Sequence, residues 1–345
     1  MLTIHTTLPD GFLEASSGGL HQILPGPTLI HLPGRNPRPV FVSILLHGNE
    51  DTGLKAVQRV LASSASSTLP RALSIFVGNV QAAAVGLRRL DAQPDFNRVW
   101  PGAETAGLPE HNMTQKVVEE MRTRSVFASI DIHNNTGLNP HYACVNRLDR
   151  PFLHLATLFS RIVVYFERPL GVQSAAFAGL CPAVTVECGK PGNVEGEQEA
   201  ARLVEAALRL DHFPAHAVAK HDLDLYHTVG TVKVPDTVSF TVHGKPADVR
   251  FVPELERMNF TELAPGTHFA DVVPGCAAPL HVSDPRGEQV TAHFFALRGG
   301  ELRTIRPVMP AMLTRDERVI RQDCLCYLME RLPYPDSVMT APSEL

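Results

Sequence analysis

Short, uninterrupted apolar runs recur along the first two hundred residues, and they constrain the fold of this chain more than any other feature. Several are rich in β-branched residues, as in VFVSILL and AVTVE. Such runs are typical of strands that are buried on both faces of a largely parallel sheet. The runs lie at residues 40–46, 72–78, 125–132, 161–166 and 183–187.

Segments between these runs place apolar residues at helical spacing. In the first of them, apolar side chains recur at Leu54, Val57, Val60 and Leu61, which marks one face of a helix. The helical segments lie at residues 51–63, 113–123, 152–160 and 195–210. Strands that alternate with helices predict an α/β fold with a mixed, largely parallel sheet and helices on both faces.

The sequence changes character near residue 220. From there to about residue 305, Gly and Pro separate short strand-like pieces, which predicts a smaller antiparallel β-rich domain. We therefore expect two domains, over residues 1–217 and 218–345. The second is predicted to end with a helix over residues 316–331 and a loose tail that contains Pro and Ser.

Charge and apolar content argue against some classes of partner. The 345-residue chain has a net charge of −5, whereas a nucleic-acid-binding protein needs a concentrated basic face. No apolar run reaches the roughly 18 residues of a membrane span, and the first residues lack the pattern of a signal peptide. We expect a cytoplasmic protein that binds neither nucleic acid nor membrane.

The six cysteines show no regular disulfide framework. Cys324 and Cys326 form a C-x-C pair that is able to contact a metal, but no second pair with zinc-finger spacing accompanies it. We interpret them as ordinary cysteines of a reduced protein.

Three residues near predicted strand ends carry the side chains that a catalytic metal requires. His47 directly follows the strand at 40–46, Glu50 comes three residues later, and His133 follows the strand at 125–132. Ligands bind beyond the carboxyl ends of strands in open α/β sheets, so these side chains are placed to meet. Two imidazoles and one carboxylate are typical of catalytic zinc, which keeps a further position for water.

A purely structural role for these residues is also open. The chain has 16 histidines, and H-x-x-E alone is a weak motif. A histidine at a strand end is more often a satisfied polar residue than a ligand. The metal interpretation therefore depends on the residues around it.

Two acidic residues at strand ends support the metal interpretation. Glu187 ends a largely apolar strand, where a carboxylate is costly unless it is paired or catalytic. Beside a metal it would act as general base toward the attacking water. Asp131 shares a strand face with His133 and is able to orient that ligand, although capping of the strand end explains it equally well.

Residues 79–102 resemble a loop that contains Arg88, Arg89, Asn97 and Arg98. The simple interpretation is a solvated turn with exposed arginines. The alternative is a substrate-binding wall, because arginine forks bind carboxylates and an adjacent amide adds neutral hydrogen bonds. A second arginine there is able to stabilise the oxyanion that forms when water attacks a carbonyl.

Four ordered blocks resemble the succinylglutamate desuccinylase/aspartoacylase family of the zinc carboxypeptidase superfamily. They are HGNEDTG (47–53), the N…G-x-R-R…DFNR-x-x-PG stretch (79–102), DIHNNTG (131–137) and VECGKPGN (186–193). The resemblance implies a zinc-carboxypeptidase-like catalytic domain over residues 1–217. The β-rich remainder looks like the C-terminal domain of that family.

The resemblance also implies the metal and the base. His47, Glu50 and His133 would ligate one zinc ion per chain. Glu187 would activate the attacking water.

Substrate-binding roles follow from the same resemblance. Arg88, with Arg89 as a less favoured substitute, would polarise the scissile carbonyl, and Asn97 and Arg98 would bind the α-carboxylate of the substrate. Aspartoacylase-like members carry a further arginine some ten residues before the catalytic glutamate, where this chain has Phe177. This difference favours a substrate side chain that is less acidic than aspartate.

The predicted reaction is hydrolysis of the amide bond of an N-acyl amino acid by Glu-assisted attack of zinc-bound water. Two alternatives stay open. The same site would serve a zinc carboxypeptidase that acts on short peptides, and a catalytically silent small-molecule-binding protein is the third interpretation. The sequence does not set the oligomeric state, and a homo-oligomer is one option.

Overall fold

The computed structural model describes residues 2–103 and 107–334. They form two compact units. The first comprises the described residues of Met1–Asn134, His141–Leu225 and Pro333–Leu345, and the second comprises Asn135–Pro140 and Tyr226–Leu332. Most of the predicted loose tail falls outside the described residues.

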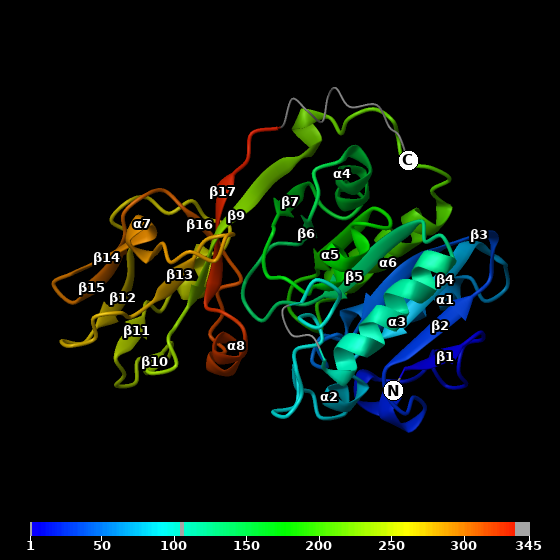
Figure 1. Cartoon of the computed structure of the whole chain (residues 1–345), viewed down its shortest axis with the longest axis horizontal. Helices are drawn as coiled ribbons and strands as arrows, with labels where there is room; N and C mark the ends of the chain where they lie inside the picture. Colours follow the sequence, from blue (N-terminus) through cyan, green and yellow to red (C-terminus); the bar gives the residue numbers. More distant parts are fainter. Residues whose placement is uncertain (1, 104–106, 335–345) are drawn as a thin grey trace. The chain divides into compact units, whose positions relative to one another are not determined.

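The first unit is built on a mixed, largely parallel sheet in the order β1-β2-β4-β3-β5-β8-β6-β7 (Figure 1). The central strands β4, β3, β5 and β8 run parallel, whereas β2 is antiparallel to β4 and β6 is antiparallel to β8. This sheet confirms the predicted fold class. The strands are β1 (Thr3–His5), β2 (Thr28–Leu32), β3 (Gly34–Ile44), β4 (Leu69–Val77), β5 (Ala128–His133), β6 (Tyr142–Val145), β7 (Ile162–Tyr165) and β8 (Ala183–Glu187).

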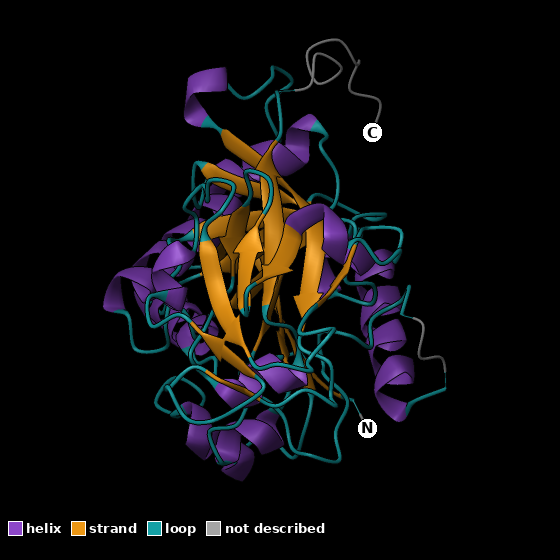
Figure 2. Cartoon of the chain, turned by 90° about the vertical axis from the view of Figure 1, so that its left-hand side faces the viewer, coloured by secondary structure: helices purple, strands orange, loops and turns teal. Residues whose placement is uncertain are grey.

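Helices pack on both faces of this sheet, with α1 and α6 on one face and α5 on the other. Figure 2 shows the helices and strands of the chain in separate colours. Helices α1 and α6 pack side by side, and Gly53 of α1 approaches β3 so closely that a Cβ atom there would lie 2.8 Å from Ile44. Phe41 points to the opposite face of β3, where its ring stacks on Phe177 of α5 at 4.5 Å. The helices of this unit are α1 (Thr52–Ser63), α2 (Val80–Ala84), α3 (Pro109–Thr123), α4 (Arg150–Thr157), α5 (Gln173–Phe177) and α6 (Val194–Arg209), with 3-10 helices at Ser17–Gln22 and Lys220–Asp222.

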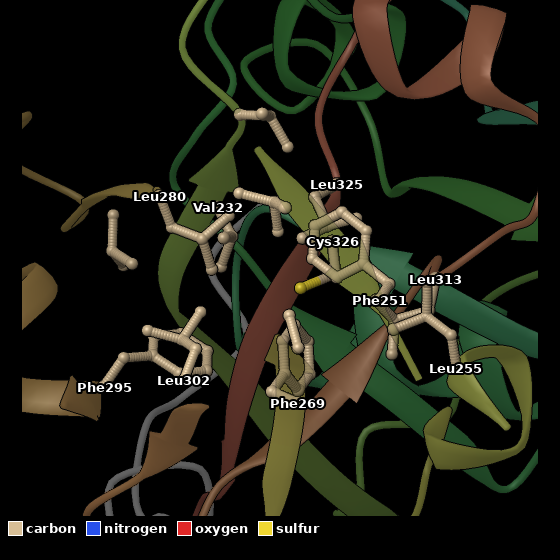
Figure 3. Packing of buried hydrophobic residues seen from close by; sticks show 14 of the residues in the cluster. Val232, Phe251, Leu255, Phe269, Leu280, Phe295, Leu302, Leu313, Leu325 and Cys326 are labelled. Atoms are coloured by element: carbon tan, nitrogen blue, oxygen red, sulfur yellow. The ribbon is translucent and has the colours of Figure 1, made fainter. Parts of the chain in front are cut away.

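The second unit is rich in short strands, as predicted. Strands β13 and β17 both pair with β9, β16 pairs with β17, and a separate sheet has the order β10-β11-β12-β15-β14. Phe251, Phe269, Leu302, Leu325 and Cys326 belong to its apolar core (Figure 3). The elements are β9 (Asp224–Lys233), β10 (Phe240–Thr241), β11 (Val249–Phe251), a 3-10 helix (Leu255–Met258), β12 (His268–Val272), β13 (His281–Ser283), α7 (Thr291–Phe294), β14 (Phe295–Arg298), β15 (Glu301–Thr304), β16 (Met309–Ala311), α8 (Glu317–Gln322) and β17 (Cys326–Arg331).

The predicted helix over residues 316–331 is wrong in its second half. Helix α8 begins after Asp316, whose side chain accepts from two backbone N–H groups, but it ends at Gln322. After three further residues, Cys326–Arg331 form β17, antiparallel to β9, with Cys326 and Leu328 fully buried. A short apolar run fits both helical and strand periods, and the pairing with β9 decides between them.

The helices in the described part of the chain do not include one that is long and apolar enough to cross a membrane.

Acid stability should depend on His31. This histidine of β2 is 6% exposed, and its Nδ1 lies 2.8 Å from Oγ of Ser74. Burial and the charge of Arg124, partly offset by Glu120, lower the pKa of His31 to about 4. The unfolded chain takes up this proton near pH 6.5 and the folded chain only near pH 4, so the free energy of unfolding should fall as the pH falls between these values.

The free energy of unfolding should fall less between pH 7 and pH 4 in His31→Gln than in the original protein. We expect a difference of up to about 3 kcal/mol, measured by urea unfolding. His221→Gln, a change of an exposed histidine, provides the control. Equal slopes for the two variants would contradict the assignment.

Candidate metal centre and active site

Three of the predicted site residues, His47, His133 and Glu187, stand at or shortly beyond the carboxyl ends of three neighbouring parallel strands. His133 is the last residue of β5, Glu187 is the last residue of β8, and the two are paired in the register of these strands. His47 lies three residues beyond Ile44, the end of β3, which pairs with the other side of β5. Strand order and register therefore bring three distant parts of the sequence to one edge of the sheet.

The turn after β3 is shaped so that His47 and Glu50 face the same point. The chain leaves the strand through Leu45, whose φ of 54° lies in the left-handed region that non-glycine residues seldom adopt. Gly48 then passes against α2, where a Cβ atom would lie 2.2 Å from the backbone nitrogen of Ala83. The backbone N–H of Glu50 donates to the carbonyl of His47 at 3.2 Å and closes the turn. The H-G-x-E spacing thus needs glycine at its second position.

His47, Glu50 and His133 form a buried group that is able to hold a metal ion. Their ligand atoms lie within 4.8 Å of one another. One carboxylate oxygen of Glu50 lies 2.8 Å from Nδ1 of His47, and the other lies 2.8 Å from Nδ1 of His133. Two imidazole nitrogens and a carboxylate turned toward one point fit Zn²⁺. Among the described residues, no other group of three or more His, Cys, Asp or Glu side chains meets this condition, and Cys324 and Cys326 belong to none.

A further carboxylate supports each histidine from the far side of its ring. Nε2 of His47 lies 3.0 Å from Oδ1 of Asp95, and Nε2 of His133 lies 2.8 Å from Oδ2 of Asp131. Ser43 donates to the other oxygen of Asp131 at 2.6 Å. A proton held on Nε2 leaves the Nδ1 lone pair for a metal. Asp95 was not among the predicted site residues, and its only signal in the sequence was its place at the start of the DFNR block.

In this cluster, the carboxylates favour the charged form of His133, and the histidines favour the charged form of Glu50. Burial opposes protonation of His133, but the carboxylates of Asp131 and Glu50 outweigh it and raise the pKa of His133 well above its usual range. Burial would raise the pKa of Glu50, yet His47 and His133 hold the pKa of that carboxyl well below its usual range. The carboxylate is therefore ionised at neutral pH, as a metal ligand must be.

Arg88 and Arg89 point in different directions. The guanidinium of Arg88 lies 3.0 Å from Oδ2 of Asp95 and 3.6 Å from Oε1 of Glu50. Arg89 instead donates to the backbone carbonyl of Gln93 at 2.8 Å. The structure thus brings Arg88 to the metal group and engages Arg89 with Gln93, while the catalytic role of Arg88 stays a prediction.

The side-chain amide of Asn97 is engaged inside the protein. Its Nδ2 lies 3.4 Å from Oδ2 of Asp131 and 3.2 Å from Nε2 of His133, and its Oδ1 accepts from the backbone of Gln173 at 2.9 Å. Arg98 is half-buried and donates to the carbonyl of Asn97 at 2.8 Å. Of the two residues predicted to bind a substrate carboxylate, Arg98 is the more exposed.

Asn134 joins the loops at this edge of the sheet, and it was not among the predicted site residues. Its backbone N–H donates to Glu50 at 3.2 Å, and its side chain accepts from the backbone of Thr52 at 3.2 Å and donates to the carbonyl of Gly189 at 2.8 Å. The one signal in the sequence was its position directly after His133. Asn134 thereby fixes the orientation of the Glu50 carboxylate.

A buried His–Glu–His group at the carboxyl edge of a mixed α/β sheet defines a candidate metallohydrolase. The family model described as the succinylglutamate desuccinylase/aspartoacylase catalytic domain matches residues 38–213, which is about half of the chain. The chain belongs to the succinylglutamate desuccinylase/aspartoacylase family. The matched range contains all seven residues predicted for the site.

Solved structures have the same fold. The succinylglutamate desuccinylase from Chromobacterium violaceum is 18% identical with a TM-score of 0.55, over 88% of this chain and 87% of that chain. Succinylglutamate desuccinylase from Vibrio parahaemolyticus is 13% identical with a TM-score of 0.58, over 86% and 82%. Murine aminoacylase 3 is 15% identical with a TM-score of 0.54, over 87% and 98%. A comparison with curated protein sequences gives no match.

Asp95 should contribute to metal affinity although it is not itself a ligand. In Asp95→Asn the contact with Nε2 of His47 loses its charge, so zinc affinity should fall about 10- to 100-fold. Competition with a fluorescent zinc chelator measures this change. Asp91→Asn, an exposed position of the same loop, is the control. Unchanged zinc affinity in Asp95→Asn would show that Asp95 does not help His47 to bind zinc.

Proposed function

We propose that the chain is a zinc-dependent amidohydrolase that cleaves the amide bond of N-acyl amino acids. Family membership supports a hydrolytic deacylase of this kind. The observation that carries the proposal is the register of β5 and β8, which sets Glu187 beside His133 and hence beside the metal group. The names of the similar structures, succinylglutamate desuccinylases and an aminoacylase, agree with N-acyl amino acids as the substrate class.

His47, Glu50 and His133 would hold one zinc ion per chain. The Nδ1 atoms of both histidines face the Glu50 carboxylate, and this donor set fits zinc. A bound Zn²⁺ supplies Lewis acidity, which makes water a better nucleophile at neutral pH and polarises a carbonyl oxygen.

Glu187 is proposed to move the proton of the reaction. It is 8% exposed, as suits a base shielded from bulk water. Its carboxylate accepts a proton from the attacking water, whose oxygen forms a bond to the acyl carbon. The same proton is then delivered to the leaving nitrogen as the C–N bond breaks, which regenerates the carboxylate. The products are a carboxylic acid and a free amino acid.

Arg88 is proposed to stabilise the oxyanion. Its guanidinium is held at the metal group by Asp95 and Glu50, and its side chain is 9% exposed. A buried, pre-oriented cation stabilises developing negative charge more strongly than one in water.

Arg98 is proposed to bind the α-carboxylate of the substrate, with Asn97 beside it. Phe177 is packed in the core against Phe41, so this position offers no cation to an acidic substrate side chain. We therefore propose a substrate whose side chain is less acidic than aspartate.

Activity should depend on Glu187. We expect Glu187→Gln to retain zinc and to lower kcat by at least about 100-fold, because the proton-transfer group is lost. The assay is a hydrolysis screen over N-acetyl, N-succinyl and N-formyl amino acids, with dipeptides as comparators, together with elemental analysis of zinc per chain.

Glu195→Gln, a change of an exposed carboxylate at the start of α6, is the matched control. Near-normal turnover of the Glu187 variant would exclude the general-base role. Faster turnover of dipeptides than of every N-acyl amino acid would replace the proposed substrate class with short peptides.

The neighbouring arginines allow a paired test. Arg88→Gln should lower kcat by about 10²- to 10³-fold, as expected for loss of an oxyanion donor. Arg89→Gln should retain activity within a few-fold, because that side chain bonds to Gln93. Steady-state kinetics on the best substrate of the screen gives both values, and the reverse order would move the role to Arg89.

A further inference from the structure

A second candidate site lies at the opposite edge of the same sheet. A cavity of about 470 Å³ opens where β3 and β4 begin and α6 ends. Its lining includes Arg35, Arg71, Arg209 and Asp211. Because β3 and β4 run parallel toward the metal group, this cavity lies at their amino-terminal ends and is separate from the metal group.

Arg71 is a buried cation whose hydrogen-bond partners are neutral. It is 1% exposed. Its guanidinium donates to the backbone carbonyls of Arg38 at 3.0 Å, Leu210 at 2.8 Å and Asp211 at 3.4 Å, and it lies 3.7 Å from the ring centroid of Phe127. In the described part of the chain, no carboxylate forms an ion pair with it. A buried charge that lacks an opposite charge is costly.

A structural role accounts for part of this arrangement. Arg71 binds the carbonyl groups just beyond the end of α6, which ties that helix to β4. These carbonyls satisfy hydrogen bonds but do not neutralise the charge. Burial and the positive charge of Arg38 lower the pKa of Arg71, while Asp211 acts in the opposite direction. The local environment therefore disfavours the cation unless negative charge is added.

The remaining arginines of the cavity add to the excess of positive charge. Arg35 and Arg209 are exposed, and neither forms an ion pair within the described residues. Three guanidinium groups and the single carboxylate of Asp211 give the lining a net charge of +2. Arginine forks match the geometry of phosphate oxygens, and the volume is within the range of small-ligand pockets.

We propose that this cavity binds a small phosphate dianion, either inorganic phosphate or the phosphate group of a small monoester. Arg35 and Arg209 contact its oxygens from the rim, and Arg71 supplies the buried positive charge. The site is independent of the proposed hydrolysis.

Thermal unfolding of the zinc-loaded protein tests the proposal. Phosphate at 10 mM, against sodium chloride of equal ionic strength, should raise Tm by about 2 °C if Kd is near 1 mM. The double variant Arg35→Gln/Arg209→Gln keeps the buried Arg71, so it should fold and lose this shift. Calorimetry should show a Kd for phosphate at least tenfold weaker in that variant. Glycerol 3-phosphate, measured in parallel, separates a monoester ligand from free phosphate.

Two single variants serve as controls for where phosphate binds. Arg202→Gln changes an exposed arginine on the same helix and should retain the full shift. Arg98→Gln changes a residue of the proposed substrate site and should also retain the rise in Tm caused by phosphate. Loss of the shift in Arg98→Gln but not in the double variant would place phosphate at the metal group and overturn the proposal. The proposal would also be overturned if sodium chloride raised Tm as much as phosphate does, or if neither inorganic phosphate nor glycerol 3-phosphate raised Tm.

Discussion

The carboxylate of Glu50, held between Nδ1 of His47 and Nδ1 of His133, is the interaction on which the rest of the site depends. It forms only because β3 and β5 are neighbours, run parallel and end at the same edge. A shift of β5 by one residue would turn His133 to the other face of the sheet. The pairing of β5 with β8 then adds Glu187 at the same level.

Four largely buried charges are tolerated at this edge because each has an opposite partner. They are Glu50, Arg88, Asp95 and Asp131. Side-chain oxygens of Asp95 lie 3.0 Å from both His47 and Arg88, so a proposed metal ligand and the proposed oxyanion donor share one carboxylate. The site is therefore a connected network rather than a set of independent residues. A change at Asp95 is expected to affect metal affinity and carbonyl polarisation together.

The two ends of this sheet differ in their electrostatics. At the carboxyl edge, carboxylates surround the histidines and Arg88. At the amino edge, Arg71 is buried among backbone carbonyls and two further arginines line the same cavity. The first end is suited to a metal cation, and the second to an anion.

The sequence by itself determined the α/β fold class and the group of His47, Glu50 and His133, because buried strands need uninterrupted apolar runs and the candidate ligands lie at or within a few residues of the strand ends. The second half of residues 316–331 was predicted wrongly. Its apolar residues fit both the helical and the strand period, and only the pairing of β17 with β9 makes it a strand. Only the tertiary structure showed which of two adjacent arginines reaches the metal group. It also revealed Asp95, because a contact across 48 residues leaves no local pattern in the chain.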